Sequence, residues 1–412
     1  MAHAPVYLPR HIDQRLAESV RTAPVVLLDG PRGAGKTTTA ARLASSVVML
    51  PRDQEQLNVD PEGYLRVLTP PVLLDEWQLV GSDLLWTLKR IVDEDPSPGR
   101  FILTGSVEPA AYGPTYPLTG RAVRLVMRPM TVAELSGRGS ATTFLAEVLA
   151  GRLPSFGPGS SSPFDLETLG RAGFPAARNL PDAHLFYDAY ASLVSQRAGE
   201  EGRDGTRLLR ALRALATLTA QAVPDQRIWE AADVNKATWR HYDDLLTRTH
   251  LVAPVPAYES NRLARLTAYP KRHLADTAMA LALAGLAVDD LRADPTTAGR
   301  FLESFVMQQL RPQIDGAGGS LMHARTGAGS REVDAVIEIG RTLLGVEVKL
   351  GTRPGRADAD PLAWLRDQLP DRFAHGFVVH TGADCYPLGN RLLAVPLTMV
   401  IGDTGTAKRA GG

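Results

Sequence analysis

The sequence predicts an α/β protein whose first third forms a parallel sheet with helices on both faces. Two observations predict this fold. Short, continuously apolar runs recur at Val25 to Asp29, Val47 to Leu50, Pro71 to Asp75 and Phe101 to Thr104. Segments of helical character separate them, and Leu79 to Val92 suits a crossover helix. Strands that are apolar along their whole length are typical of parallel sheets buried on both faces.

The rest of the chain predicts a helical middle and a second α/β region. Ser155 to Pro163 is rich in Gly, Ser and Pro, which predicts a flexible surface loop or linker. Leu185 to Leu251 has largely helical character. From about Tyr269 onwards, the pattern predicts helices at Thr277 to Leu291 and Ala298 to Leu310, and strands within Glu332 to Leu350, Gly376 to His380 and Leu393 to Val400.

A chain of 412 residues is expected to contain roughly two to four domains. We place the boundaries at 1–135 for the parallel-sheet domain, 136–200 for a helical connector, 201–265 for a helical module, 266–402 for the second α/β domain and 403–412 for a tail.

Composition bounds the class of protein. The 45 basic and 45 acidic residues cancel, so a nucleic-acid surface would have to be a local patch. The single cysteine, Cys385, cannot form an internal disulfide, which favours a reducing compartment. No apolar stretch approaches the roughly 20 residues of a membrane span. We expect a cytoplasmic protein without a membrane anchor.

The strongest motif follows the first predicted strand. Gly30-Pro-Arg-Gly-Ala-Gly-Lys-Thr37 matches the Walker A pattern, and a helix-compatible stretch follows it. Its glycines let backbone amides surround a phosphate, its lysine reaches the β- and γ-phosphate oxygens, and its hydroxyl binds Mg²⁺. The predicted nucleotide-binding residues are Gly30, Pro31, Arg32, Gly33, Ala34, Gly35, Lys36, Thr37 and Thr38.

An acidic pair follows a neighbouring strand, as Mg²⁺-dependent nucleotide hydrolysis by a P-loop enzyme requires. Asp75 is expected to join Thr37 in holding Mg²⁺, and Glu76 to orient the attacking water. The sequence has no Asn-Lys-x-Asp motif for guanine, so ATP is favoured over GTP. An Asp-Glu pair and a long C-terminal extension disfavour a P-loop kinase.

Two further positions are candidates for sensing the γ-phosphate. Thr104 and Ser106 end the next predicted strand, although a simple strand-to-turn transition would use the same residues. Arg121 could serve as an arginine finger or sensor, or lie as a solvated surface residue. Lys36, Glu76, Ser106 and Arg121 are therefore the predicted catalytic residues.

Acidic residues recur on a predicted hairpin near the C-terminus. If Gly340 and Arg341 form a two-residue turn, Asp334 falls opposite Glu347, and Lys349 opposite Glu332. The same register places Val333, Ala335, Ile337, Val346 and Val348 together on a buried face.

Two facing carboxylates repel unless a cation lies between them. The arrangement matches the PD-(D/E)XK nuclease core, in which acids hold Mg²⁺ and a lysine helps to activate water. Glu303, on a helix before the hairpin, could add a third ligand to Asp334 and Glu347. An amphipathic hairpin with a charged solvent face would give the same pattern without any metal.

The middle region contains a helix-turn-helix pattern from Ile228 to Tyr242. Lys236, Arg240 and His241 could contact phosphates of DNA. Alternatively, the segment packs between domains, with Trp239 and Tyr242 in its core.

Taken together, the motifs resemble those of a prokaryotic, largely uncharacterised group of AAA-type P-loop ATPases. The resemblance spans nearly the whole chain and rests on Tyr7 to Arg10, Gly30 to Thr37, Asp75-Glu76, Leu103 to Ser106, Gly120-Arg121, Pro129 to Leu135, Gly173 to Pro175, Asp276-Thr277, Glu303 to Val306, Glu332 to Asp334 and Glu347 to Lys349. It implies a winged-helix-like middle segment and a restriction-endonuclease-like C-terminal domain.

Two functions remain open at this point. One is Mg²⁺-dependent ATP hydrolysis coupled to a nuclease-like domain, with DNA as a candidate partner. The other is a nucleotide-dependent switch or scaffold for a protein partner, without nuclease activity. Oligomer formation is compatible with both, since Arg121 could act within its own chain or on a neighbouring copy.

Overall fold

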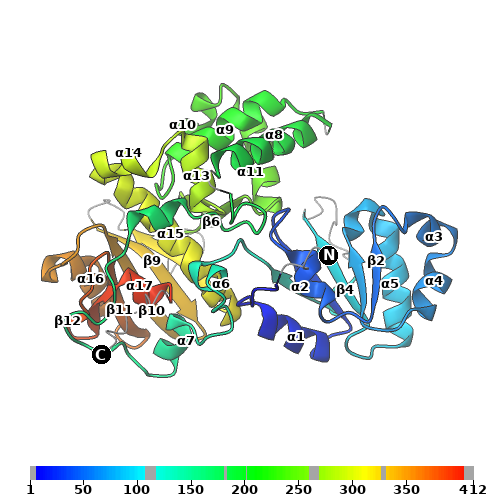
Figure 1. The fold of residues 1–412 in the computed structure, drawn as a ribbon, viewed down its shortest axis with the longest axis horizontal. Helices are drawn as coiled ribbons and strands as arrows, with labels where there is room; N and C mark the ends of the chain where they lie inside the picture. Colours follow the sequence, from blue (N-terminus) through cyan, green and yellow to red (C-terminus); the bar gives the residue numbers. More distant parts are fainter. Residues whose placement is uncertain are drawn as a thin grey trace, which may run out of the picture.

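The computed structural model describes residues 6–106, 117–180, 183–200, 202–258, 269–325 and 331–402. An N-terminal α/β domain (blue to cyan) and a C-terminal α/β domain (yellow to red) lie at opposite ends of Figure 1. A helical region (green) lies above them, and it is reached through a connector that runs past the C-terminal domain.

The N-terminal domain is built on a five-stranded parallel sheet of order β2-β3-β4-β1-β5. Its elements are α1 (Asp13–Thr22), β1 (Val25–Asp29), α2 (Lys36–Ala41), β2 (Ser46–Met49), α3 (Gln54–Val59), α4 (Pro61–Val67), β3 (Val72–Asp75), the 3₁₀ helix η1 (Trp77–Leu79), α5 (Ser82–Glu94), β4 (Phe101–Gly105) and β5 (Ala122–Val126). The four predicted strands and the crossover helix are confirmed within a few residues. β5 is an additional strand, at one edge of the sheet.

The burial of strand β1 explains why its sequence is continuously apolar. All five of its residues are buried. Val25 and Leu27 pack in one hydrophobic core with Leu88 of α5, whereas Val26 and Leu28 pack in another on the opposite face of the sheet. A strand buried on both faces has no solvent side and therefore no polar alternation.

The connector belongs in space to the C-terminal domain. It contains α6 (Val132–Leu135), α7 (Phe144–Leu149) and the 3₁₀ helix η2 (Leu166–Gly170). The glycine- and serine-rich stretch within it makes several backbone hydrogen bonds, including Gly157 N to Cys385 O at 3.0 Å and Phe164 N to Thr381 O at 2.8 Å. This stretch lies at the surface as a loop, one of the two predicted alternatives, but it is not a free linker, because these bonds dock it on the C-terminal domain.

The helical region contains α8 (His184–Glu200), α9 (Gly205–Thr217), α10 (Asp225–Ala231), α11 (Lys236–Arg248), β6 (Val252–Val255), β7 (Lys271–Leu274) and α13 (Thr277–Ala284). A short turn joins α10 to α11, and β6 and β7 pair as an antiparallel arm. Trp239 and Tyr242 are buried in the core, whereas Lys236, Arg240 and His241 are exposed on α11. DNA contact by this exposed face stays a prediction.

The C-terminal domain holds a six-stranded mixed sheet of order β12-β13-β11-β10-β9-β8. Its elements are α14 (Val288–Ala293), α15 (Pro295–Gly316), β8 (Ser320–Arg325), β9 (Glu332–Ile339), β10 (Thr342–Lys349), the 3₁₀ helix η3 (Arg356–Ala359), α16 (Asp360–Gln368), β11 (Phe373–His380), β12 (Tyr386–Gly389), β13 (Leu392–Pro396) and α17 (Leu397–Val400). The last predicted strand is shorter than expected, because Leu397 to Val400 turn into a helix after Pro396.

The predicted β9–β10 hairpin is confirmed from Thr342 opposite Ile339 to Val346 opposite Ala335. The predicted single buried face is wrong at Val333, which packs in a different core from Ala335 and Ile337. The reason is an irregularity in the pairing with β8, where Met322 lies opposite Val336 but Ala324 lies opposite Val333. Strand β9 thus carries one extra residue there, as in a β-bulge, and its alternation changes phase.

None of the helices in the described part of the chain is long and apolar enough to cross a membrane.

Candidate functional site

The phosphate-binding loop joins the carboxyl end of β1 to α2, at the position where the Walker A motif is expected. Gly30 has a φ of 148°, and a Cβ there would lie 2.1 Å from the carbonyl oxygen of Met127. Gly35, directly before α2, has a φ of 99°. Only glycine fits both positions, because the first allows no side-chain atom and both have left-handed backbone angles.

Lys36 and Thr37 begin α2 and point to different partners. Lys36 is buried, and its Nζ donates hydrogen bonds to the carbonyls of Gly30 at 2.9 Å and Pro31 at 3.0 Å. Burial lowers the pKa of Lys36, an effect opposed by the nearby carboxylates of Glu76, Asp29 and Asp75. Both contacts hold the ammonium group inside the loop that it would share with a phosphate.

The two predicted magnesium ligands of the loop lie in contact. Thr37 Oγ1 donates to Asp75 Oδ1 at 2.7 Å, and Thr104 Oγ1 donates to the same oxygen. Asp75 ends β3 beside Thr104 on β4, so the parallel register brings the three side chains together. A hydroxyl beside a carboxylate is a donor set that suits Mg²⁺, a cation that prefers oxygen ligands.

Glu76 lies next to this pair in a left-handed backbone conformation, with a φ of 54°. Its Oε2 accepts hydrogen bonds from Gln78 Nε2 and, at 3.3 Å, from Ser106 Oγ. A non-glycine residue in this conformation is unusual and is found at functional sites. The structure therefore brings Glu76 and Ser106 together, and their catalytic roles stay predictions.

Arg121 does not face this edge. It directly precedes β5, whose Ala122 lies beside Val25, the first residue of β1. The loop follows the last residue of β1, about 17 Å away along five residues of strand. Arg121 instead pairs with Asp93 of α5. Sensing the γ-phosphate in its own chain does not fit this placement, and action on a neighbouring copy stays a prediction.

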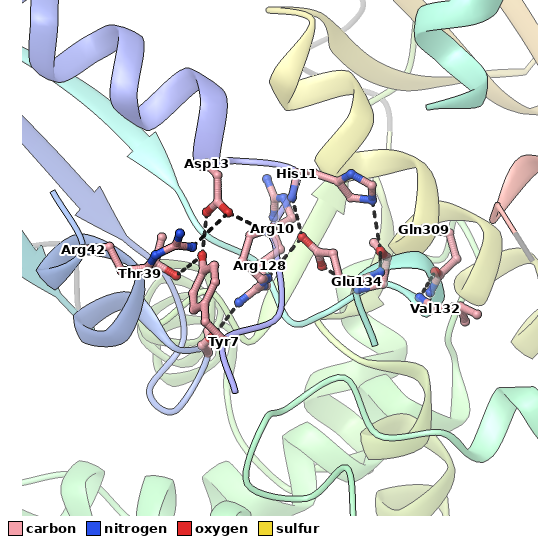
Figure 2. A network of polar contacts seen from close by, with 12 residues as sticks. Tyr7, Arg10, His11, Asp13, Thr39, Arg42, Arg128, Val132, Glu134 and Gln309 are labelled. Carbon is pink, nitrogen blue, oxygen red and sulfur yellow. Dashed lines mark hydrogen bonds and ion pairs between the residues drawn. The ribbon is translucent and has the colours of Figure 1, made fainter. Parts of the chain in front are cut away.

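A buried ion pair lies next to the phosphate-binding loop (Figure 2). Arg10 Nε lies 3.1 Å from Glu134 Oε1, and both side chains are almost fully buried. Arg10 also donates to the carbonyls of Ala34 in the loop at 2.8 Å and of Arg128 at 2.6 Å. Glu134 accepts from the backbone amide of His11 at 2.7 Å. The motifs at Tyr7 to Arg10 and Pro129 to Leu135 thus meet beside the loop.

A second cluster in Figure 2 fixes the outer side of α2. Tyr7 Oη donates to Asp13 Oδ1 at 2.6 Å and lies 3.1 Å from Thr39 Oγ1. The guanidinium of Arg42 lies 3.8 Å from the centre of the Tyr7 ring, a cation–π distance. The segment before α1 therefore covers the helix that carries Lys36.

The helical region touches the loop from the other side. A Cβ at Gly33 would lie 3.7 Å from Phe174, and one at Gly35 would lie 3.7 Å from Pro175. Tyr190 Oη on α8 donates to the carbonyl of Arg32 at 3.1 Å. The motif Gly173 to Pro175 therefore packs directly on the phosphate-binding loop.

Asp276 holds this contact in place from the helical region. Its fully buried carboxylate accepts hydrogen bonds from Gly173 N at 2.7 Å, Tyr187 Oη at 2.9 Å and Met279 N at 3.0 Å. Burial raises the pKa of Asp276, while the donated hydrogen bonds lower it. This explains why Asp276 and Gly173, far apart in sequence, both appeared among the motifs.

Sequence reasoning missed three basic residues near the loop. Arg124 Nε lies 2.5 Å from Asp29 Oδ2 at the end of β1, and Arg128 Nε lies 2.6 Å from Asp315 Oδ2 on α15. The pKa of His250 falls to about 3 because of burial and the nearby charges of Arg128, Arg124 and Lys36. None of these three residues belongs to a motif, and only the fold brings them close to the phosphate-binding loop.

The C-terminal carboxylates surround a lysine from another element. Lys271 on β7 lies 2.7 Å from Glu303 Oε1 and 3.2 Å from Asp334 Oδ1. Glu347 instead pairs with Lys349 at 2.8 Å. Burial and the charge of Asp334 raise the pKa of Glu347 to about 8, with Lys349 opposing.

The predicted metal site of Glu303, Asp334 and Glu347 does not fit this arrangement. Among the residues that the structure describes, no three His, Cys, Asp or Glu side chains are grouped so that they could hold a metal ion. The physical reason is that the ammonium of Lys271 stands between Glu303 and Asp334. Lys271 belongs to no motif, so no sequence pattern pointed to it.

Comparison with known families defines the class of the N-terminal domain. Residues 22–136 match the family model described as an AAA domain. Two models described as domains of unknown function match residues 169–290 (DUF8612) and 298–400 (DUF4143). The N-terminal part of the chain is thus an AAA-type P-loop ATPase domain, followed by two regions whose functions are not described.

Similar whole chains are known. The chain is 28% identical over 402 residues to uncharacterized proteins of Mycobacterium tuberculosis and Mycobacterium bovis, with 94% of this chain and 83% of each relative covered. Among solved structures, a Walker-type ATPase of Pyrococcus abyssi is 14% identical, with a TM-score of 0.42 over 69% of this chain and 99% of that chain.

Proposed function

We propose that this chain is a Mg²⁺-dependent ATPase that uses ATP hydrolysis to switch the contacts between its N-terminal domain and its helical region. The observation that carries the proposal is the cluster at the carboxyl edge of the parallel sheet. There Lys36 and Thr37, at the start of α2, meet Asp75 and Glu76, at the end of β3.

The roles follow from the position of each group. The loop amides and Lys36 bind the phosphates, with Lys36 exchanging its carbonyl acceptors for phosphate oxygens. Thr37 and Asp75 would hold Mg²⁺, which neutralises charge on the β- and γ-phosphate oxygens. Glu76, held by Gln78 and Ser106, orients the attacking water as a general base. Ser106, which contacts Glu76, would report the presence of the γ-phosphate through it.

Glu76→Gln tests this assignment. We expect the rate of ATP hydrolysis to fall by about 10²- to 10⁴-fold, because the amide keeps the shape of the side chain but cannot accept a proton. ATP affinity should change little, since the phosphates are held by the loop. Steady-state phosphate release and ATP binding would be measured in parallel, with Glu55→Gln on the exposed face of α3 as the control. Full turnover in Glu76→Gln would remove Glu76 from the mechanism.

The switching part of the proposal rests on the contacts at the loop. Phe174 and Pro175 pack on its glycines, and Tyr190 binds the carbonyl of Arg32. Closure of the loop on a phosphate would change these contacts. Nucleotide binding would thereby shift the position of the segment around Gly173. Asp276, which binds the backbone amide of Gly173, would transmit this shift to α13.

Tyr190→Phe tests the coupling. We expect ATP and ADP affinity to weaken about fivefold, because one hydrogen bond that pre-orders the loop is worth about 1 kcal/mol. Isothermal titration with each nucleotide gives the measurement, and Tyr64→Phe on α4 is the matched control. Unchanged affinity for both nucleotides, with the fold intact, would show that α8 does not restrain the loop.

The C-terminal domain has two candidate roles, nuclease and scaffold. We favour the scaffold, with a protein partner, because Lys271 compensates the carboxylates that a nuclease would use for metal. DNA remains the candidate partner of the exposed face of α11.

A further inference from the structure

Lys271 is the most enclosed charged side chain of the helical region's β-arm. Its side chain is 1% exposed, and it lies on β7 at the junction with the C-terminal domain. Its Nζ is 2.7 Å from Glu303 Oε1, 2.7 Å from Glu332 Oε1 and 3.2 Å from Asp334 Oδ1. An ammonium group has three donors, and three carboxylates face it.

The charges in this cluster depend on one another. Burial alone would lower the pKa of Lys271, but the charges of Glu303, Asp334 and Glu332 outweigh it and raise the pKa overall. Burial raises the pKa of Glu303, and the neighbouring Asp334 raises it further. Without the ammonium group, the largely buried carboxylates of Glu303 and Asp334 would lose the cation between them, which is strongly unfavourable. Glu332, in contrast, would keep Arg325 at 3.8 Å.

The ammonium also takes the space that a metal would need. A Mg²⁺ ion requires oxygen ligands at about 2.0–2.1 Å in octahedral geometry. An ion bound by both Glu303 and Asp334 would have to lie between them, where Nζ already lies within hydrogen-bond distance of each. The ammonium group of Lys271 and a metal ion therefore cannot occupy this position at the same time.

The backbone keeps Lys271 there. The arm that carries it joins β8 through hydrogen bonds from His323 N to Pro256 O at 2.9 Å and from Tyr258 N to His323 O at 2.5 Å. Arg311 on α15 donates to the carbonyl of Pro254 at 3.1 Å. These contacts hold the arm that carries Lys271 against β8 and α15.

From this geometry we infer that Lys271 permanently replaces a divalent cation in the acidic cluster of the C-terminal domain. Glu303 and Asp334 consequently bind no metal ion and catalyse no metal-dependent hydrolysis. The cluster instead fastens the β6–β7 arm to α15 and β9. This inference stands independently of ATP hydrolysis at the N-terminal site.

The test uses Mn²⁺ as the probe and the full-length chain without nucleotide. All variants carry Asp75→Asn, which removes the expected cation ligand of the phosphate-binding loop. With Lys271 present, adding Asp334→Asn should leave Mn²⁺ binding unchanged. Lys271→Met should gain one Mn²⁺ per chain, seen by electron paramagnetic resonance and titration calorimetry, and its thermal unfolding temperature should rise with Mn²⁺. Combining Lys271→Met with Asp334→Asn should abolish both gains.

Two further variants keep the result interpretable. Lys271→Arg retains the charge and should gain no Mn²⁺. If Lys271→Met does not fold, Lys271→Met with Glu332→Gln removes one repelling charge and retains Glu303 and Asp334 for the metal. Loss of Mn²⁺ binding on Asp334→Asn with Lys271 intact would overturn the inference. So would a folded Lys271→Met chain, with or without Glu332→Gln, that takes up no additional Mn²⁺.

Discussion

Replacing Lys36 with alanine is expected to lower the rate of ATP hydrolysis by about a thousandfold or more, because the chain loses its main positive charge on the γ-phosphate. ATP affinity should fall as well, since the lysine contacts the phosphates in the ground state. The measurement is phosphate release at saturating Mg²⁺ and ATP, together with direct ATP binding.

A surface lysine provides the control for this experiment. Lys89 on α5 pairs with Asp93 and lies away from the loop. Lys89→Ala should leave turnover unchanged. If Lys36→Ala and Lys89→Ala both retained the full rate, hydrolysis would have to occur elsewhere in the chain. The roles proposed for Thr37, Asp75 and Glu76 would then all be wrong.

Arg10→Met is expected to destabilise the N-terminal domain by about 3–5 kcal/mol, because it leaves the carboxylate of Glu134 buried without its cation. The side chains of both partners are at most 5% exposed. The loop should also loosen, since Arg10 binds the carbonyl of Ala34. We therefore expect a lower urea midpoint and weaker ATP binding in the same variant.

The matching double variant separates the ion pair from simple loss of packing. Arg10→Met with Glu134→Gln removes both charges and should be more stable than Arg10→Met alone. Arg66→Met, which breaks an exposed pair with Glu62, should hardly move the urea midpoint. A double variant as unstable as Arg10→Met would show that the buried charge of Glu134 is not the cause.

The sequence predicted the loop and its acidic neighbours because their geometry is local. A strand, a glycine-rich turn and a helix fix Lys36 and Thr37 within one short segment. Asp75 follows because parallel strands present their carboxyl ends at one edge of the sheet. The predicted hairpin register from Ile339 to Thr342 succeeded for the same reason, since a short turn determines which residues face each other.

The failures concern residues whose role depends on remote chain segments. The position of Arg121 at the amino edge of the sheet could not be foreseen because β5 was not recognised, and a residue that precedes a parallel strand lies at that edge. Lys271 could not be foreseen, since its partners come from α15 and β9. The β-bulge in β9 depends on its pairing with β8, which no alternation pattern in β9 reveals.

The docked stretch around Gly157 constrains how the chain reaches its final state during synthesis. Its partner, Cys385, leaves the ribosome more than two hundred residues later. The N-terminal domain has all of its strands once β5 has emerged, so it can fold early. The stretch that follows stays without its partner until the segment around Cys385 has been synthesised. Contacts that join such distant segments form late and slowly. A ribosome-bound intermediate of this protein would thus pair a finished ATPase domain with an exposed connector.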